Sequence, residues 1–376
     1  MIKDILKAIF PRMLLKKAFS VYNRLKIETI DKIFFPEYVV SEADFLVYRK
    51  GYPFRENKVS LDDIATEEVQ FYMKNWYDWT QEEFILEFNK PCYIEPDHGW
   101  AIVPPRNLLY YSLGISRTGF LRKPGLLKFW RRSKVISVSK AISLRDSGEE
   151  NYLHFYNDVL TKLFFLKSSS IDFDSVPLII SKKLWEKQYF QYYLDNNAEI
   201  KSLHWLIQDD EFVRCESSVF CKALTHRKDF FTQIFTPLYK PGNFNKRIFI
   251  SRSKGRLRHI KNSDEVESML IKYGFETVDA DHLSTAEQID AFVNAGIIVG
   301  VHGAGLTNLM FRNGSCEILE IFPYPEEGYL PFHYIMLAKM KGFFYDGLIG
   351  ERNKTQFSDG FLVDPIRLEV SLKRLL

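Results

Sequence analysis

The sequence predicts an α/β fold made of two doubly wound domains that face each other across a cleft. Predicted strands alternate with predicted helices from about residue 135 onward, which is typical of parallel sheets covered by helices. The chain has 376 residues, 46% of them hydrophobic, which exceeds one ordinary α/β domain and suits two cores. A Pro-Gly pair within 240–243 predicts the linker between the domains.

The first half of the chain is irregular up to about residue 130. It contains strand-like pieces at 44–49 and 100–103 and a polar stretch at 62–90 that predicts a helix. Beyond this part, the pattern predicts strands at 135–144, 177–180 and 212–214, and helices at 152–166, 183–194 and 230–235.

The second half alternates more regularly. Strands are predicted at 247–250, 276–279, 297–301, 317–321 and near 343, and helices at 263–273, 285–295, directly after 302, and at 334–341. Ser284 is a good N-cap with Glu287 at the capping-box position, and Ser263 is expected to cap its own helix. A final helix at 364–376 is expected to pack back across the cleft.

The basic residues are clustered although the net charge is only +3. Residues 1–26 contain seven basic residues and one acid, and residues 117–140 and 240–261 each contain eight basic residues and no acid. Such blocks indicate local anionic partners and argue against a nucleic-acid-coating surface, so no nucleic acid is expected as a partner. The four cysteines lack metal-ligand spacing, which predicts reduced, mostly buried thiols.

No run of about 20 apolar residues occurs, so no membrane-spanning helix is expected. Cationic residues interrupt the apolar residues of 1–26, which makes this segment a poor signal peptide. Its apolar residues recur at helical spacing, as in a helix that lies on an anionic membrane surface. A helix packed on the protein body with its lysines in water would have the same pattern.

The strongest binding signal is the turn that follows the apolar run 297–301. His302 ends this predicted strand, and Gly303, Ala304 and Gly305 lead into a predicted helix. A strand, a tight turn of small residues and a helix start together present free N–H groups and a positive helix dipole to a phosphate. Ligands gather at this end of the strands in open α/β sheets.

Further polar residues are expected at the same edge. Arg252 follows the strand 247–250, and Arg258 and Asn262 lie in the basic loop after it. Glu320 lies in the strand 317–321, where its carboxylate could accept hydrogen bonds from a ribose diol. The arginines, the helix start and the carboxylate together predict a site that binds the phosphate and the ribose of a nucleotide.

A second candidate pair lies in the first half of the chain. His154 and Asp158 are four residues apart in a predicted helix, so they share one helical face. A histidine–carboxylate pair that faces an interdomain cleft is suited to general-base chemistry. A surface pair that only stabilises the helix would look the same in the sequence.

The ordered motifs resemble those of glycosyltransferase family 61 over roughly residues 135–323. The matching positions are Asn151-Tyr152, His154, Asp158, Ile250-Ser251-Arg252, Arg258, Asn262, Glu265, Glu287-Gln288-Ile289, His302-Gly303-Ala304-Gly305-Leu306, Asn308, Glu320-Ile321 and Pro323. The resemblance implies an inverting, nucleotide-sugar-dependent transferase of GT-B architecture, with two Rossmann-like domains.

The resemblance also implies which half of the chain binds the donor and which half binds the acceptor. We expect a basic amphipathic segment at 1–30, one domain at 31–239, a second domain at 240–350 and a C-terminal helix at 351–376. The resemblance implies that the first domain is on the acceptor side and that the second binds the nucleotide-sugar. Asp158 or His154 is expected to act as the base, and donor binding is assigned to Arg252, Arg258, Asn262, His302, Gly303, Ala304, Gly305, Asn308 and Glu320. Arg258 and Asn262 are alternatively expected to shape their loop.

The implied partners are a nucleotide-sugar donor, a saccharide or lipid-linked saccharide acceptor, and an anionic membrane surface met through 1–26 and 117–140. The implied setting is bacterial surface or capsular polysaccharide synthesis on the cytoplasmic side of the membrane, with the enzyme peripheral to it. No cofactor and no metal are expected, because the arginines and the helix dipole already offset negative charge. The acidic triplets at 172–174 and 279–281 are therefore not taken as metal ligands.

Other functions remain open from the sequence. A nicotinamide oxidoreductase is disfavoured because the turn at 303–305 lacks the third glycine of the dinucleotide fingerprint. Transfer of a pyruvyl or phospho-sugar group on a similar scaffold would use the same basic pocket. A non-catalytic, membrane-associated assembly factor would keep the fold without turnover.

Overall fold

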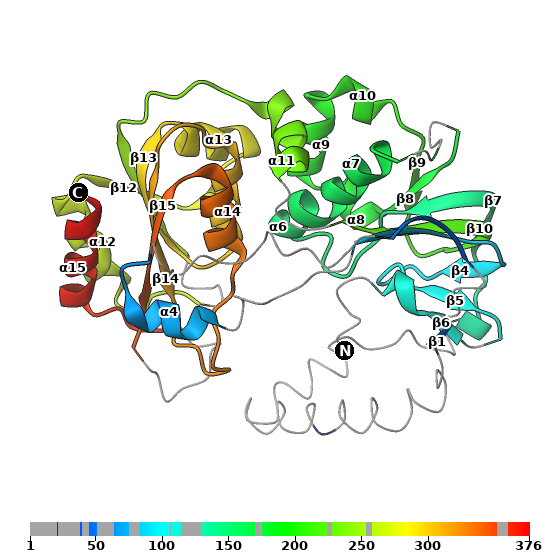
Figure 1. Ribbon diagram of the computed structural model, residues 1–376, viewed down its shortest axis with the longest axis horizontal. Coiled ribbons are helices and arrows are strands. Elements are labelled where there is room, and N and C mark those ends of the chain that lie inside the picture. Colours follow the sequence, from blue (N-terminus) through cyan, green and yellow to red (C-terminus); the bar gives the residue numbers. More distant parts are fainter. Residues whose placement is uncertain are drawn as a thin grey trace.

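The computed structural model is a two-domain α/β structure (Figure 1). The residues it describes are 21, 38–39, 45–50, 64–74, 83–105, 107–113, 129–169, 171, 175–223, 228–252, 258–351 and 360–376. The basic block 1–26 apart from residue 21, the first half of the basic block 117–140 (residues 117–128) and the acidic triplet 172–174 lie outside these ranges. No helix of the described part of the chain is long and apolar enough to cross a membrane.

The N-terminal domain is built on a mixed sheet with ten described strands. Its longest path runs β1-β6-β5-β4-β10-β7-β8-β9, and β3 joins β10 to β2. The strands are β1 (Tyr38–Val39), β2 (Phe45–Lys50), β3 (Phe84–Phe88), β4 (Cys92–Ile94), β5 (Ala101–Val103), β6 (Asn107–Leu109), β7 (Val135–Ser143), β8 (Leu178–Ser181), β9 (Trp205–Gln208) and β10 (Phe212–Lys222). Strands β10, β7, β8 and β9 form a parallel, Rossmann-like part, and β1 also pairs parallel with β6, while β3 and β4 pair antiparallel to β10.

Helices cover the parallel part of this sheet. They are α6 (Tyr152–His154), the π-helix η6 (Phe155–Leu160), α7 (Thr161–Lys167), α8 (Lys182–Trp185), α9 (Gln188–Asp195), α10 (Ala198–Lys201) and α11 (Lys228–Phe235), with the short η4 (Tyr110–Ser112) and η7 (Thr236–Leu238). The predicted helix at 183–194 is divided into α8 and α9, and the predicted strand at 212–214 is much longer. Among the described residues of the predicted helix at 62–90, α4 (Glu67–Met73) is helical, and 84–88 is a strand.

The C-terminal domain is a five-stranded parallel sheet in the order β12-β11-β13-β14-β15. Its strands are β11 (Lys246–Ile250), β12 (Phe275–Val278), β13 (Ala295–Val301), β14 (Glu317–Phe322) and β15 (Phe344–Ile349). Its helices are α12 (Ser263–Lys272), η8 (Ala280–His282), α13 (Thr285–Val293), the 3₁₀-helix η9 (Ala304–Phe311), α14 (His333–Lys341) and α15 (Pro365–Leu375). The regular alternation predicted for this half, and the α/β class of the whole chain, are confirmed.

Local sequence explains several of these elements. Ser284 and Glu287 form the predicted capping box of α13, which ties up two N–H groups that the helix start leaves without a partner. Ser263 is the first residue of α12 and not its cap, because Asn262 occupies the N-cap position. All four cysteines are buried and free, as predicted from their spacing.

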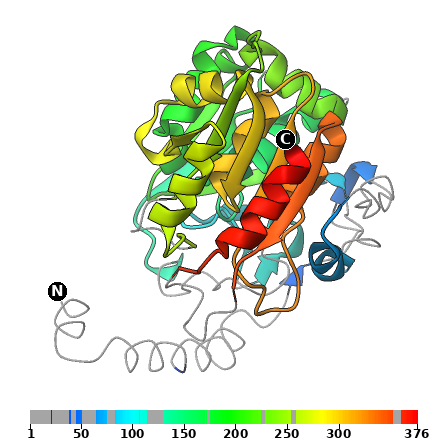
Figure 2. The same cartoon turned by 90° about the vertical axis from the view of Figure 1, so that its left-hand side faces the viewer.

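The terminal helix corrects the predicted domain boundaries. Leu368, Leu372 and Leu375 of α15 are buried in the core formed by the outer face of the C-terminal sheet and α12, and Figure 2 shows α15 across that face. The helix therefore belongs to the C-terminal domain and does not return across the cleft to the other domain. Helix α4, predicted within the N-terminal domain, contacts β15, and its neighbour Thr66 accepts a hydrogen bond from Arg374 at 3.0 Å.

Aromatic side chains join the two domains. The Phe311 ring, at the end of η9, meets Tyr156 at 5.5 Å and Phe235 at 5.1 Å between centroids, both edge-to-face. These residues belong to one continuous hydrophobic core that includes both domains. Helices α13 and α14 face the N-terminal domain, and α12 and α15 lie on the outer side (Figure 1).

Candidate active site

The strand order of the C-terminal sheet places two predicted residues at its switch point. Strand β11 has β12 on one side and β13 on the other, and a ligand crevice forms where connections diverge in this way. Arg252 lies just after β11, His302 just after β13, and Arg252 Nη1 donates to the His302 carbonyl at 2.9 Å. A Cβ at position 303 would lie 1.9 Å from Arg252 Nη1, so a larger residue there would push the Arg252 guanidinium out of this position.

His302 is held by two side chains from neighbouring strands. Its Nδ1 hydrogen-bonds Glu320 Oε1, and the Tyr345 hydroxyl donates to Glu320 Oε2 at 2.6 Å. The imidazole also stacks on Phe322 with 5.3 Å between ring centroids. With Nδ1 directed at the carboxylate, Nε2 is the ring nitrogen that can meet a ligand.

Glu320 therefore has a different role here from the predicted one. The residue is 0% exposed, and both carboxylate oxygens accept hydrogen bonds from His302 and Tyr345. A ribose diol cannot reach it in this arrangement. The carboxylate fixes the orientation and tautomer of His302, as carboxylates do for ligating histidines.

Arg258 faces the same group of side chains. Its backbone has φ +64°, a left-handed conformation that non-glycine residues adopt rarely and mostly at functional sites. Burial lowers the pKa of Arg258, although the charges of Tyr334 and Glu320 act in the opposite direction. Burial raises the pKa of Tyr334, and the positive charges of Arg258 and Arg252 act to lower it. Both arginines therefore lie near the His302–Glu320 pair.

Asn262 is engaged by the protein. Its Nδ2 donates to the Val363 carbonyl at 2.8 Å and to Glu265 Oε2 at 3.0 Å, while its Oδ1 accepts from the Val363 amide at 3.1 Å. These contacts tie the start of α12 to the segment before α15. They favour the loop-shaping role over contact with a phosphate.

The glycine turn leads into η9 as a helix start should. Ala304 and Gly305 are half-buried, and the N–H groups of a first helical turn have no partner within the helix. A Cβ at Gly305 would lie 3.0 Å from Ile250 Cγ2, so the small residue lets η9 approach the end of β11. The turn thus retains the geometry of an anion site.

Asn308 is an interdomain contact and not an exposed donor ligand. It is 0% exposed, its Oδ1 accepts from the Tyr152 hydroxyl at 2.8 Å, and its Nδ2 donates to Gln288 Oε1 at 3.0 Å. One amide thereby connects the first residue of α6 with α13 of the other domain. Its predicted role in donor binding can only be indirect in this arrangement.

The predicted catalytic pair is formed. His154 Nδ1 and Asp158 Oδ2 lie 2.5 Å apart, with side-chain exposures of 25% and 20%. Asp158 lies in η6, and π-helical turns are frequent at functional sites. Burial acts to lower the pKa of His154, but the hydrogen bond and charge of Asp158 outweigh it and raise that pKa. Burial likewise acts to raise the pKa of Asp158, and His154 turns the net shift downward.

His333 connects the two histidine–carboxylate pairs, and the sequence analysis missed it. Burial lowers its pKa to about 4, with a compensating effect of Asp158 and further lowering by His154 and His302. The charges of both pairs therefore act on His333, which is the first residue of α14. A single histidine at the start of a mostly buried helix has no partner at helical spacing, so no sequence pattern marks it.

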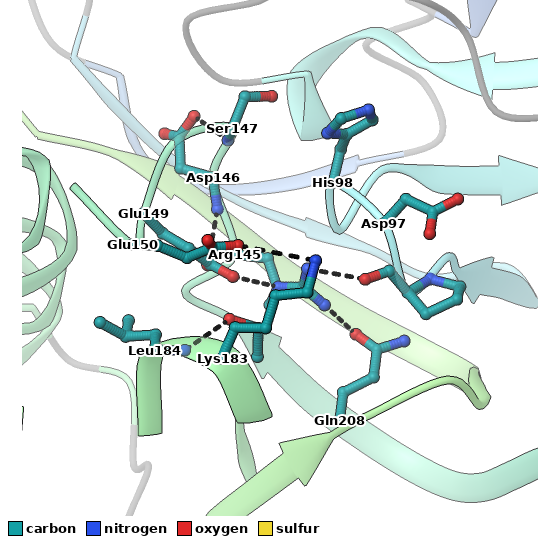
Figure 3. A network of polar contacts seen from close by, with 12 residues as sticks. Asp97, His98, Arg145, Asp146, Ser147, Glu149, Glu150, Lys183, Leu184 and Gln208 are labelled. Carbon is teal, nitrogen blue, oxygen red and sulfur yellow. Dashed lines mark hydrogen bonds and ion pairs between the residues drawn. The ribbon is translucent and has the colours of Figure 1, made fainter. Parts of the chain in front are cut away.

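A buried polar network positions the loop before α6 (Figure 3). Arg145 Nε donates to Glu149 Oε1 at 2.8 Å, Nη2 donates to the Pro96 carbonyl at 3.0 Å, and Nη1 donates to Gln208. Lys162 Nζ donates to Asp146 Oδ2 at 2.7 Å within the same region. Because these groups are buried and paired, the loop that carries the start of α6 is fixed.

Within the described ranges, no three His, Cys, Asp or Glu side chains converge as a metal site would require. Of the acidic triplets, Asp279 accepts from the Asp281 amide at 3.0 Å and caps η8. What the site does contain is two arginines, a helix start and two oriented histidines. This set can bind a diphosphate and can remove a proton from a hydroxyl group.

Comparison with known proteins agrees with this chemistry. Residues 152–319 match the family described as Glycosyltransferase 61. The chain is 31% identical over 110 residues, 28% of its length, to an EGF domain-specific O-linked N-acetylglucosamine transferase of Drosophila melanogaster. It is 36% identical over 73 residues, 18% of its length, to alpha-1,3-arabinosyltransferase XAT3 of Oryza sativa subsp. japonica. These matches cover only 20% and 12% of the two curated relatives. The segment from α6 to β14, which carries most of the site, is therefore the part of the chain that is similar to glycosyltransferase family 61.

Proposed function

We propose that the protein is an inverting glycosyltransferase that moves a sugar from a nucleotide-sugar donor to a hydroxyl group of a saccharide or lipid-linked saccharide. The observation that carries the proposal is that each domain holds one histidine–carboxylate pair, His154 with Asp158 and His302 with Glu320. Among the residues that the structure describes, Arg252 and Arg258 lie near the His302–Glu320 pair. This asymmetry separates a basic donor side from a less charged acceptor side.

The donor diphosphate binds at the switch point of the C-terminal sheet. Its oxygens are contacted by Arg252, Arg258 and His302 Nε2. The backbone N–H groups of Ala304 and Gly305, at the start of η9, donate further hydrogen bonds to it. The two arginines offset the charge that develops on the leaving diphosphate as the bond to the sugar breaks. Glu320 acts on the donor through His302.

His154 is the base, and Asp158 is its positioning residue. A carboxylate with a lowered pKa is a weak base, whereas an imidazole with a raised pKa is a stronger one. The acceptor O–H proton passes to His154 Nε2 while the acceptor oxygen forms a bond to the anomeric carbon. The bond from that carbon to the diphosphate oxygen breaks on the opposite face, so the configuration is inverted.

The remaining features of the proposal rest on the resemblance and on the charges of the site. The reaction needs no metal, because the arginines supply the positive charge. The acceptor belongs to a bacterial surface polysaccharide, and the enzyme works on the cytoplasmic side of the membrane through residues 1–26 and 117–140. The two curated relatives are eukaryotic, so this setting depends on the motif resemblance alone.

A thermal-shift and hydrolysis panel of UDP-, GDP-, CMP- and dTDP-sugars tests the proposal, with and without EDTA. One nucleotide class should stabilise the wild type, and Arg252→Ala should lose that response. Arg247→Ala is the matched control, because Arg247 lies on the same strand but donates to the Tyr273 carbonyl. A response that disappears in EDTA would contradict the metal-free mechanism, and no response to any nucleotide would contradict the donor class.

A further inference from the structure

A second cavity lies at the junction of the domains, away from the candidate active site. Its volume is about 510 Å³, within the range of small-molecule sites. Helix α11 and η7 form one wall, and the C-terminal ends of η9 and α14 form the other. The lining residues are Phe231, Thr232, Phe235, Thr236, Tyr239, Met310, Phe311, Asn313, Met340 and Lys341.

The cavity is separated from the active site by the length of two helices. Helix α14 begins at His333, beside the catalytic pairs, and ends at Lys341, in the cavity wall. The nine residues of this helix span roughly 13 Å at the rise of an α-helix. The 3₁₀-helix η9 likewise begins after His302 and ends with Met310 and Phe311 in the cavity wall. The cavity is thus not an extension of the donor site.

The lining is mostly apolar with a single cationic group. Phe231 and Phe235 stack on each other with 5.6 Å between centroids, and methionine side chains line the other wall. Lys341 is half-buried, and its Nζ is 3.4 Å from Asn313 Oδ1. Apolar walls with one convergent charged group are typical of a site for an amphipathic ligand.

The positive charge at this end of the cavity is not neutralised by the described residues. Arg312, next to the lining residue Asn313, is 0% exposed and stacks on Phe244 at 3.7 Å. Its Nη1 has no hydrogen-bond partner. Burial lowers the pKa of Lys341 to about 8, and the charge of Arg312 acts in the same direction. Within the part of the chain that the structure describes, neither cation forms an ion pair, so an anion would be stabilised here.

We propose that this cavity binds an aliphatic chain with one anionic head group, such as a fatty-acyl carboxylate. The head group pairs with Lys341, and the chain lies against Phe235, Tyr239 and Met340. Because one wall comes from each domain, the bound chain stabilises the junction between them. This inference does not depend on the proposed transferase activity.

Calorimetric titration of the full chain with dodecanoate tests the inference. We expect saturable binding of one ligand per chain and no such binding of dodecyltrimethylammonium, whose head group is cationic. Lys341→Gln should weaken binding about tenfold, because it removes the charge-assisted contact. Thr232→Trp should abolish binding by filling the cavity from an exposed position, where the substitution leaves the core intact. Lys339→Gln, on the same helix but outside the lining, is the matched control.

Three results would overturn the inference. The first is no saturable binding up to about 1 mM, the weak end of specific affinity. The second is binding that Lys341→Gln and Thr232→Trp leave unchanged, which would place the ligand elsewhere. The third is competition between dodecanoate and the stabilising nucleotide, which would place the fatty acid in the donor site.

Discussion

The two histidine–carboxylate pairs have the same chemistry but are built differently. His154 and Asp158 lie four residues apart in one helical segment, with about a quarter and a fifth of their side chains exposed. His302 and Glu320 come from adjacent strands, and Glu320 is completely buried with a second donor in Tyr345. The difference indicates that the first pair can exchange a proton with a ligand, while the second holds one imidazole in a fixed orientation beside two arginines.

The largest effect is expected from His154→Asn. The asparagine Nδ2 can still hydrogen-bond Asp158, but Nε2 of the imidazole is lost. We expect kcat to fall about 10²–10⁴-fold, the usual contribution of a general base. Steady-state kinetics with the identified donor would measure this. His282→Asn is the matched control, because His282 also pairs with a carboxylate, Asp279 at 3.6 Å, but is 79% exposed; an equal loss in both variants would remove His154 from the chemistry.

A smaller effect is expected from Glu320→Gln. Loss of the carboxylate leaves His302 less firmly oriented, and we expect the dissociation constant of the donor nucleotide to rise about tenfold. A 2′-deoxyribose donor distinguishes this role from direct ribose binding. If Glu320 acts through His302, removing the 2′-hydroxyl should raise the dissociation constant by the same factor in the wild type and the variant. If removing the 2′-hydroxyl weakens binding to the wild type but not to Glu320→Gln, Glu320 contacts the ribose directly.

The pH profile offers a third comparison. His154 must be unprotonated to act as a base, so its raised pKa places the acidic limb of kcat/KM above the ordinary value of about 6.5. In Asp158→Asn the hydrogen bond to a charged group is lost while burial remains, so the limb should move below that value. If the acidic limb of kcat/KM does not move in Asp158→Asn, it reports the titration of a group other than His154.

The smallest effect is expected at the contact between the domains. Tyr152→Phe removes the hydroxyl that donates to Asn308, and we expect the free energy of unfolding to fall by about 0.5–1.5 kcal/mol. Tyr192→Phe, on α9, is a control because the Tyr192 side chain is half-buried and its carbonyl, rather than its hydroxyl, accepts the bond from Asn196. Urea denaturation would measure both, and an unchanged midpoint in Tyr152→Phe would contradict the contact's contribution.

Prediction from the sequence succeeded where the signal is local. The capping box of α13, the alternation of the C-terminal sheet and the His154–Asp158 spacing each depend on residues within a few positions. The positions of Arg252 and His302 also followed, because the carboxyl ends of neighbouring parallel strands meet at one edge.

Prediction failed where the partner is distant in the chain. Asn308 meets Tyr152 across 156 positions, and Glu320 meets Tyr345 across 25, so one sequence gives no reason to see these polar residues as buried. The antiparallel pairing of β10 with β3 and β4 is equally non-local. Consequently the sequence could indicate that Arg252 and His302 lie at one edge of the sheet, but not which polar residues would be buried in contacts within the protein. The role of each residue in binding and catalysis stays a prediction.

The most direct test of this division is calorimetric titration of the donor nucleoside diphosphate into His154→Asn and His302→Asn. Each asparagine can keep the hydrogen bond to the neighbouring carboxylate, Asp158 or Glu320. The two variants therefore differ mainly in whether they lack Nε2 of His154 or Nε2 of His302. The account predicts wild-type affinity in His154→Asn and clearly weaker affinity in His302→Asn. Equal weakening in both variants, or weakening confined to His154→Asn, would contradict the separation of the acceptor side from the donor side.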